Sequence, residues 1–321
     1  MRGRARRVAV LAGLALLGSS VVASGAGAAA GPVEDAQAAA RRIPFTARIE
    51  ISWVDRDSFH TAELTVRSVG GNVRLQAAGL QVGDDESFVL PDGELLVPAL
   101  ERKYDVSQSS GPTVAGRETE LYSLRTAGVV REELAVDRSS GLVLQRQVFG
   151  AKGTPVRTVT VLQLDTAPMA EPAPAARHQV SVPRTISVSS VPAAYRGPAV
   201  LPGGYSRVAA YRHGQLVHLL YSDGLHGMSL FSQPGHLASA SLPQGGEAVQ
   251  VGVVVGVHYT WPGGDVVAWQ SGPLVHTLVG DGTVTDLLAA AGAVPTAGGT
   301  SLLGRLRQTS RMVAELVSGG R

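Results

Sequence analysis

The chain has 321 residues, no cysteine and a nearly balanced charge, with 28 basic and 26 acidic residues. This length favours two domains, each with its own core, over a single domain. The lack of cysteine excludes disulfides, thiolate nucleophiles, CxxC zinc sites and a lipid-modified N-terminal cysteine. We therefore expect stability to come from packed cores.

The first thirty residues have the pattern of a secretory signal peptide. A cationic start, "MRGRARR", precedes the apolar run "VAVLAGLALLGSSVV" and the small residues "ASGAGAAAG". The apolar run is shorter than the ~20 residues that a membrane-spanning helix needs. The sequence predicts that residues 1–30 are a cleaved signal peptide, with an uncleaved anchor as the alternative. The protein is expected to be secreted, into the periplasm or the extracytoplasmic cell envelope.

The basic character of the chain belongs largely to that leader. Removing its four arginines from the 28 basic residues leaves 24, against 26 acidic residues. Nucleic acid ligands demand a dense cationic surface, which a nearly neutral mature chain does not offer. Nucleic acid is therefore excluded as a partner.

Residues 31–166 read as one β-rich domain that begins with a short helix, "PVEDAQAAARRI". The segment "PFTARIEISW" alternates apolar and polar residues, and "TAELTVR" and "NVRLQA" repeat that period. Further strands are predicted in "ESFVLPDGELLVP", in "REELAVDRSSGLVLQRQVFG" and in "RTVTVLQL". Strands with hardly any helix between them predict one large twisted antiparallel sheet, either a sandwich or an open barrel.

Residues 167–198 are rich in proline, which predicts an extended interdomain linker. A smaller domain over residues 199–295 follows, with three strands expected in residues 205–231 and three more in residues 248–280. The segment "TVTDLLAAAGAV" predicts a helix capped by Thr283 or Thr285. A sheet followed by a helix is an α+β pattern, so the fold class expected for the whole chain is α+β and β-rich.

The tail, residues 296–321, predicts an amphipathic basic helix. Its apolar residues fall within one arc, with Arg307 and Arg311 across from them. Packing against its own domain and peripheral contact with a membrane or partner are the two interpretations of this helix.

Six histidines fall in the second domain, which raises the question of a metal site. No HxH or HExxH spacing occurs, and His218 and His226, which flank an Asp-Gly turn, lack a third ligand. The hairpin that carries them is better explained by folding than by metal binding. We predict no metal and no cofactor.

Familiar catalytic patterns are equally weak. "GMSLF" departs from GxSxG at its last position, and "VGDGTVTD" lacks the lysine of a phosphate-binding loop. The acidic run from Asp84 to Glu86 is typical of a solvated turn. The sequence predicts no catalytic residue and favours a binding protein over an enzyme.

The first sheet presents a row of apolar residues with little predicted helix to cover it. Only the first helix and residues 98–112 are available as lids, so a concave apolar face would accept an apolar ligand. The alternative is that both faces are covered and these side chains are ordinary core. The residues predicted to line the face are Phe45, Ile49, Ile51, Trp53, Leu64, Val66, Leu75 and Phe88.

Two blocks of sequence resemble the RseB/MucB family of sigma-E regulatory proteins. "TVAGRETELYSLR" followed by "REELAVDRSSGLVLQRQVFG" is similar to the family's V-x-G-R and D-x-x-[TS]-G-L-x-L patterns. "LPGGYSRV" followed by "HLLYSDGLHGMSLF" is similar to its second-domain pattern. The resemblance covers most of residues 32–290, while the long proline-rich segment and the tail have no counterpart in it.

This resemblance implies a function that composition alone does not. It implies an N-terminal antiparallel half-barrel similar to the lipoprotein carriers LolA and LolB, and a smaller C-terminal domain of sheet and helix. Members of the family hold the extracytoplasmic part of an anti-sigma factor and shield it from a protease, and a lipid or lipoprotein relieves this hold. The hairpin of the second domain then becomes the expected partner-binding site, with Tyr205, His218, Tyr221, Asp223, Gly224 and Leu225.

The expected function is therefore an extracytoplasmic negative regulator of a sigma-factor pathway. Its expected partner is the outer domain of an anti-sigma factor, with a lipid or lipoprotein ligand in the apolar cavity. The alternative is a LolA-like carrier that moves lipid or lipoprotein cargo through the envelope.

Overall fold

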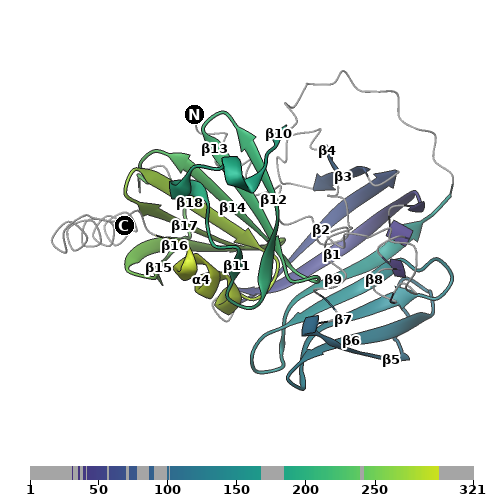
Figure 1. Cartoon of the computed structure of the whole chain (residues 1–321). Helices are drawn as coiled ribbons and strands as arrows, with labels where there is room; N and C mark the ends of the chain where they lie inside the picture. The colour runs from purple at the N-terminus through teal and green to yellow at the C-terminus, as the bar shows by residue number, and fades with distance from the viewer. Residues whose placement is uncertain are drawn as a thin grey trace. The chain divides into compact units, whose positions relative to one another are not determined.

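A computed structural model of the chain describes residues 31, 35–36, 39–40, 42–55, 58–69, 72–77, 87–89, 100, 102–167, 184–238 and 242–295. Side chains are described for these residues except 72–77 and 87–89. The chain divides into two compact units, one around each of two antiparallel sheets (Figure 1). The predicted α+β, β-rich class is confirmed. The predicted signal peptide and the tail from residue 296 lie outside the described residues.

The first sheet has nine strands in the order β4-β3-β2-β1-β9-β8-β7-β6-β5. β4 and β5 are its two ends and do not pair with each other, so the sheet formed by the described strands is open rather than a closed barrel. The strands are β1 (Phe45–Asp55), β2 (Ser58–Val69), β3 (Asn72–Ala77), β4 (Ser87–Val89), β5 (Asp105–Ser110), β6 (Thr119–Thr126), β7 (Val129–Asp137), β8 (Val143–Phe149) and β9 (Pro155–Asp165).

Alternation of apolar and polar residues decides which face of this sheet is buried. In β1, Ala47, Ile49 and Ile51 are each 1% exposed, whereas the intervening Arg48 and Glu50 contact solvent. β2 and β9 flank β1 in antiparallel register, which brings Val66 and Val161 onto the same face. Side chains of alternate residues on neighbouring strands therefore form one continuous apolar layer.

The segment over residues 98–112 differs from the lid that the sequence predicts. Leu100, Arg102 and Lys103 are helical, but the chain then forms β5, which pairs with β6 at the end of the sheet. All six residues of β5 are exposed. Its sequence, "DVSQSS", has no apolar alternation because neither face of the strand is buried, and the usual strand signal is therefore missing.

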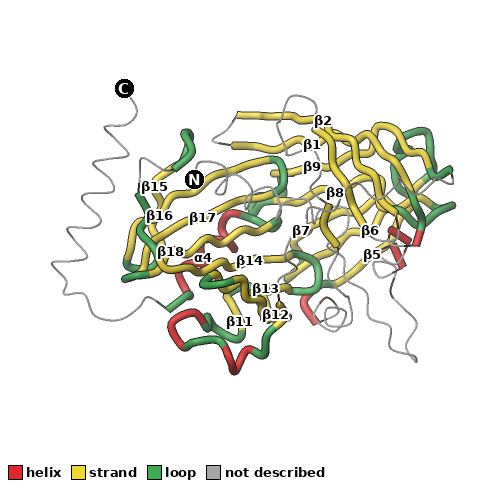
Figure 2. Tube along the Cα trace, turned by 90° about the horizontal axis from the view of Figure 1, so that it is seen from above, coloured by secondary structure: helices red, strands yellow, loops and turns green. Residues whose placement is uncertain are grey.

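The second sheet also has nine strands, in the order β10-β12-β13-β14-β18-β17-β16-β15, with β11 paired to β12 (Figures 1 and 2). All of its neighbouring strands are antiparallel. The strands are β10 (Arg184–Thr185), β11 (Val200–Leu201), β12 (Tyr205–His213), β13 (Leu216–Ser222), β14 (Gly227–Pro234), β15 (Glu247–Val251), β16 (Val254–Trp261), β17 (Gly264–Ser271) and β18 (Leu274–Gly280).

Two predictions for this unit are corrected. Residues 248–280 hold four strands rather than three, because two-residue turns at Gly252 and Gly272 divide runs that read as continuous. Both glycines have positive φ, 57° and 58°, which suits tight hairpin turns.

The predicted linker does not extend to residue 198. From Arg184 the chain belongs to the second unit: β10 pairs with β12, and the 3₁₀ turns Val188–Ser190 and Ala193–Tyr195 follow. Val191, between these turns, is 1% exposed and lies in the core of the unit. The prolines after Arg184 therefore lie in a segment that packs on the second unit, not in an extended linker.

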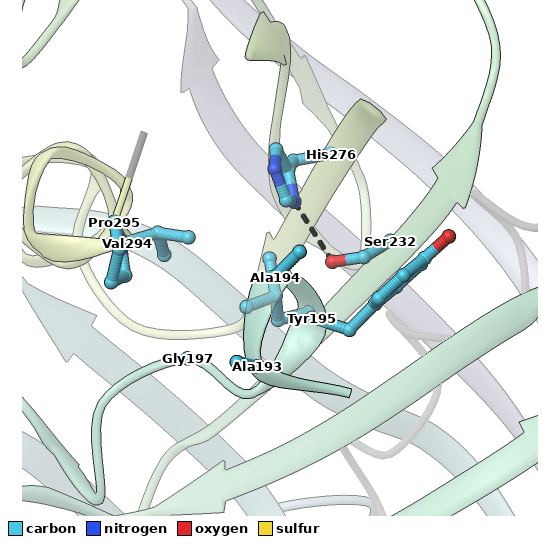
Figure 3. Close-up of a pocket in the computed structure, with 9 residues that line it drawn as sticks. Ala193, Ala194, Tyr195, Gly197, Ser232, His276, Val294 and Pro295 are labelled. Carbon is cyan, nitrogen blue, oxygen red and sulfur yellow. Dashed lines mark hydrogen bonds between the residues drawn. The ribbon is translucent and has the colours of Figure 1, made fainter. Parts of the chain in front are cut away.

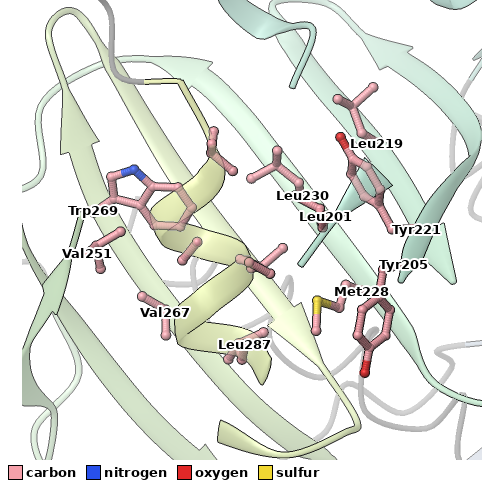
Figure 4. Packing of buried hydrophobic residues seen from close by; sticks show 14 of the residues in the cluster. Leu201, Tyr205, Leu219, Tyr221, Met228, Leu230, Val251, Val267, Trp269 and Leu287 are labelled. Atoms are coloured by element: carbon pink, nitrogen blue, oxygen red, sulfur yellow. The ribbon is translucent and has the colours of Figure 1, made fainter. Parts of the chain in front are cut away.

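The helix α4 (Val284–Ala293) covers one face of the second sheet (Figure 4). Thr283, one of the two predicted caps, is its N-cap, and its hydroxyl accepts a hydrogen bond from the Asp286 backbone N–H. Leu287, Ala290 and Ala291 pack with Trp269, Leu278 and other strand residues into one core. None of the described helices is long and apolar enough to span a membrane.

Candidate functional site

The predicted ligand-binding face is the packed face of the first sheet. Phe45, Ile49, Ile51, Leu64 and Val66 all lie on it and are at most 7% exposed. Ala39, from the helical segment, packs against the same cluster. In this conformation these five residues are core, so an apolar ligand could reach them only after their cover moved.

The other three predicted lining residues are placed differently. Trp53 is half-buried at the end of the cluster and stacks on His60, with ring centroids 5.4 Å apart. Leu75 in β3 pairs with Val66 in β2, and Phe88 in β4 pairs with Val73. Only the backbone positions of Leu75 and Phe88 are described.

The packed face also holds a charged pair. Arg146 in β8 is 6% exposed and Glu132 in β7 is 1% exposed. The guanidinium donates from Nε to Glu132 Oε1 at 2.7 Å and from Nη2 to Oε2 at 2.9 Å. A bidentate geometry of this kind compensates for the loss of water around both charges. Arg146 follows Leu144 by two residues, so one strand contributes both apolar and charged groups to the face.

The first signature block builds two linked turns. Val114 and Arg117 form an isolated β-bridge around Ala115 and Gly116, whose φ angles are 51° and 73°. Arg117 then donates to Asp137 at 2.9 Å. Asp137 also accepts hydrogen bonds from the backbone and hydroxyl groups of Ser139 and Ser140.

These contacts explain the spacing of the block in physical terms. Hydrogen bonds from the two serines and the charge of Arg117 lower the pKa of Asp137, although desolvation by burial is the largest single influence and raises it. The aspartate therefore remains ionised and ties together two turns that are twenty residues apart. The V-x-G-R and D-x-x-S-G pattern is therefore explained by the need to hold these two turns together.

The second signature block builds the β13–β14 turn. Asp223 is fully buried, and its Oδ1 accepts from the backbone N–H groups of Leu225 at 2.9 Å and His226 at 2.7 Å. Gly224 has a φ of 96°, which favours glycine. Ser222 adds a hydroxyl bond to the His226 carbonyl at 2.9 Å. The Ser-Asp-Gly-Leu sequence is thus required by the turn.

The remaining predicted partner-binding residues are also inside the second unit. Tyr205 and Tyr221 are fully buried, and the Tyr221 hydroxyl donates to the Pro198 carbonyl at 2.9 Å. Leu225 is 7% exposed. Their side chains are not accessible in this conformation, and direct contact of these residues with a partner stays a prediction. They form the scaffold on which any binding surface is displayed.

His218 is held in an aromatic stack rather than opposite His226. Its ring lies 4.3 Å from the Phe231 ring and 5.4 Å from the Tyr211 ring, measured between centroids. Its Nε2 is 3.0 Å from the Ser229 hydroxyl, and burial lowers the pKa of His218 to about 4. A ring that is neutral at pH 7 packs at little electrostatic cost, so the hairpin needs no metal to hold this histidine.

A small cavity lies in the second unit, between the Ala193–Tyr195 turn, strands β14 and β18, and the residues after α4 (Figure 3). Its volume is about 60 Å³. Ser232 and His276 line it, with Ser232 Oγ 2.8 Å from His276 Nδ1. Sequence reasoning missed this pair, because the two residues are 44 positions apart and belong to no motif.

The Ser232–His276 pair is not arranged for nucleophilic catalysis. His276 stacks on Trp269 at 5.2 Å, and burial lowers its pKa to about 4, so the ring is a poor base at neutral pH. Elsewhere in the unit, His258 Nε2 lies 2.9 Å from Asp265 Oδ1. No group of three or more metal-ligating side chains occurs among the described residues.

No family model and no curated protein sequence matches the chain. Comparison of structures does find similar proteins. A crystal structure of MucB is 20% identical, with a TM-score of 0.50, and the match covers 83% of this chain and 97% of MucB. The chain shares its fold with MucB. At this identity the likeness concerns fold, and it extends over both units.

Two further matches have lower TM-scores. The Pseudomonas aeruginosa MucA/MucB complex is 23% identical over 84% of this chain and 98% of the other, with a TM-score of 0.46. A putative outer membrane lipoprotein-sorting protein domain from Vibrio parahaemolyticus covers 44% of this chain at 10% identity, with a TM-score of 0.22. Neither similarity is close enough to add to the comparison with MucB.

Proposed function

We propose that the chain is an extracytoplasmic negative regulator of a sigma-factor pathway, in the RseB/MucB family, and that it binds the outer domain of an anti-sigma factor. The observation that carries this proposal is the placement of both signature blocks. The first block builds two turns tied by the buried Asp137, and the second builds a buried turn, in a chain with the fold of MucB. The agreement of motif, structural role and fold is more specific than any one of them.

The partner assignment comes from MucB. MucB has been solved in complex with MucA, in one case described as MucA(peri). An outer segment of a membrane-bound anti-sigma factor is the corresponding partner for this chain. Binding would use exposed surface, since the predicted hairpin residues are buried, and would require neither a cofactor nor a catalytic group.

A binding titration tests the proposal. The full chain is titrated by calorimetry with the purified outer domain of a single-span anti-sigma factor from the source organism. We expect saturable binding with a fixed stoichiometry. Binding weaker than about 100 µM would be too weak for a specific regulator. The absence of heat and of a complex up to that concentration would therefore contradict the assignment.

The continuous apolar layer around Phe45, Ile51 and Val66 favours a second function, transport of lipid or lipoprotein cargo. For a ligand to enter this layer, the helical residues that cover it would have to move. The carrier function predicts lipid transfer between donor and acceptor vesicles in proportion to protein. The regulator function predicts partner binding without such transfer.

A further inference from the structure

The cavity beside Ser232 and His276 has a polar atom without a partner on its wall. The Ser232 hydroxyl lies 2.8 Å from His276 Nδ1, whereas the other ring nitrogen, Nε2, bonds to no described residue. His276 is only 2% exposed. Its ring lies between Ser232 and Val294 in Figure 3, with Nε2 on the Val294 side. A buried polar atom that is unpaired beside a cavity is a candidate for contact with a ligand.

The Ser232 hydroxyl determines which ring nitrogen carries the proton. Among the residues that the structure describes, this hydroxyl has no second partner, so its hydrogen is used only if it donates to Nδ1. Burial lowers the pKa of His276 to about 4, so the ring carries a single proton at neutral pH. With Nδ1 as the acceptor, that proton is on Nε2. The cavity therefore has an N–H donor, which favours a ligand with an oxygen acceptor.

The rest of the lining sets the charge and the size of the ligand. Apart from Ser232, His276 and Tyr195, the described lining residues are alanine, glycine, leucine, valine and proline. A charged group buried among them would lose its water without meeting an opposite charge. One water needs about 10–15 Å³ of such a volume, so about 60 Å³ suits roughly four waters or a ligand of about six non-hydrogen atoms.

The outer wall of the cavity is held in place by strand residues. This wall is part of the segment 192–198. Arg207 donates to the Gly197 carbonyl at 3.2 Å, and the Tyr221 hydroxyl donates to the Pro198 carbonyl at 2.9 Å. A Cβ atom on Gly197 would lie 2.6 Å from the Tyr221 hydroxyl, so glycine is needed for this close approach. A wall that is already fixed lowers the entropic cost of binding a ligand.

We propose that this cavity binds a small, uncharged aliphatic carbonyl compound, such as an amide or a ketone, independently of the proposed function. The carbonyl oxygen accepts a hydrogen bond from His276 Nε2, and the aliphatic part contacts Leu230 and Val294. The ligand is bound without chemical change. Because so few atoms make contact, binding is weak, in the millimolar range.

Nuclear magnetic resonance of the full chain tests the site with two probes of the same shape. Isobutyramide is uncharged, and isobutyrate is its charged counterpart. We expect isobutyramide to shift the His276 Nε2 resonance and the methyl resonances of Leu230 and Val294, with saturation at millimolar concentration. Isobutyrate should bind at least about tenfold more weakly, because its charge would be buried without a counter-charge.

Two histidine variants locate the binding. His276→Phe keeps a ring to stack on Trp269 but removes the N–H donor, so isobutyramide should bind at least about tenfold more weakly. His218→Phe is the matched control, because His218 is also held in an aromatic stack but does not line the cavity. The methyl resonances of Leu230 and Val294 report binding in both variants, and near-ultraviolet circular dichroism reports the fold.

Ala194→Leu tests the site with both histidines in place, and it replaces His276→Phe if that variant does not fold. Ala194 is exposed and lines the cavity, so a larger side chain should narrow it and abolish isobutyramide binding. Ala199→Leu is its control, at an exposed position that does not line the cavity, and should bind as the unmodified chain does.

Three results would overturn the proposal. They are the absence of a shift up to about 100 mM isobutyramide, equal affinity for the two probes, and binding that survives unchanged in folded His276→Phe or Ala194→Leu. The first result would mean that the cavity holds only water. No anti-sigma factor is present in these experiments, so their failure is distinct from a failure of the proposed function.

Discussion

The two sheets of this protein bury polar groups of different kinds. The first places an ionised pair, Arg146 and Glu132, on the face that also carries its apolar layer. The second places two histidines, His218 and His276, in aromatic stacks where burial keeps their rings neutral. One unit therefore depends on a charge pair that must remain ionised, and the other on rings that must remain uncharged.

This difference predicts that the stability of the two units responds differently to mutation and to pH. Removing one partner of a buried ion pair takes away the charge that compensates the other. Raising the pH affects the buried histidines little, because their rings are already neutral. Acid has the opposite effect on them, because the unfolded chain takes up protons that the folded second unit cannot. The following changes probe each side of the comparison, beginning with the largest expected effect.

Glu132→Ala should destabilise the first unit by about 3–5 kcal/mol, because the buried Arg146 loses its two hydrogen bonds to the Glu132 carboxylate. Hydrogen exchange at amides of β7 and β8 would measure this loss locally. The matched control is the double change Glu132→Leu with Arg146→Met, which removes both charges and should be close to neutral. Equal losses in the single and double variants would show that packing, rather than the charge, explains the effect.

Acid should destabilise the second unit. The pKa of both His218 and His276 falls from 6.5 to about 4 on folding, so stability is complete above pH 6.5 and is lost as the pH drops toward 4. The loss is of the order of 3 kcal/mol for each histidine, at 1.36 kcal/mol per pKa unit. Urea titrations at several pH values would measure it, followed by the fluorescence of Trp261 and Trp269 in a Trp53→Phe background, because Trp53 lies in the first unit.

A His276→Gln variant provides the control for this acid sensitivity. Glutamine can still meet the Ser232 hydroxyl but does not titrate, so the dependence of unfolding free energy on pH should become shallower. An unchanged slope would mean that folding does not lower the pKa of His276.

Asp223→Ala should cost about 1–3 kcal/mol, because two buried backbone N–H groups lose their acceptor. Binding to a partner, measured per folded molecule, should be unchanged, since Asp223 is inaccessible. A drop in affinity with no loss of stability would restore the hairpin as a contact surface and contradict its structural role.

Thr283→Ala should have the smallest effect, about 1 kcal/mol, from loss of the α4 cap. Thr283→Ser keeps the hydroxyl and should restore most of this stability. Thermal unfolding of the three proteins side by side would separate the cap from the lost methyl group.

The sequence predicted strands best where burial alternates. β1 and β2 carry apolar residues at every second position, so both strands and the packed face could be predicted. β5 could not, because a strand exposed on both faces has no such period. The β15–β18 run was undercounted because its turns contain only two residues, and β10 was hidden by prolines that shape a packed segment.

The candidate site was harder to predict than the fold. The family resemblance identified Asp223 and Tyr221. The sequence alone does not distinguish a residue that a turn requires from one that contacts a partner. Burial makes that distinction, and it assigns both residues to the interior. The Ser232–His276 cavity required knowledge of which distant strands lie side by side, which periodicity does not provide.

The central claim is that this protein acts by holding another polypeptide rather than by transforming a substrate. Protease protection tests it most directly: the outer domain of a single-span anti-sigma factor from the source organism is digested with a nonspecific protease, with and without a stoichiometric amount of the full chain. The account predicts slower cleavage that saturates at a fixed ratio, with Asp137→Asn, if folded, protecting equally well. Cleavage at an unchanged rate in a mixture where the full chain remains folded would contradict it.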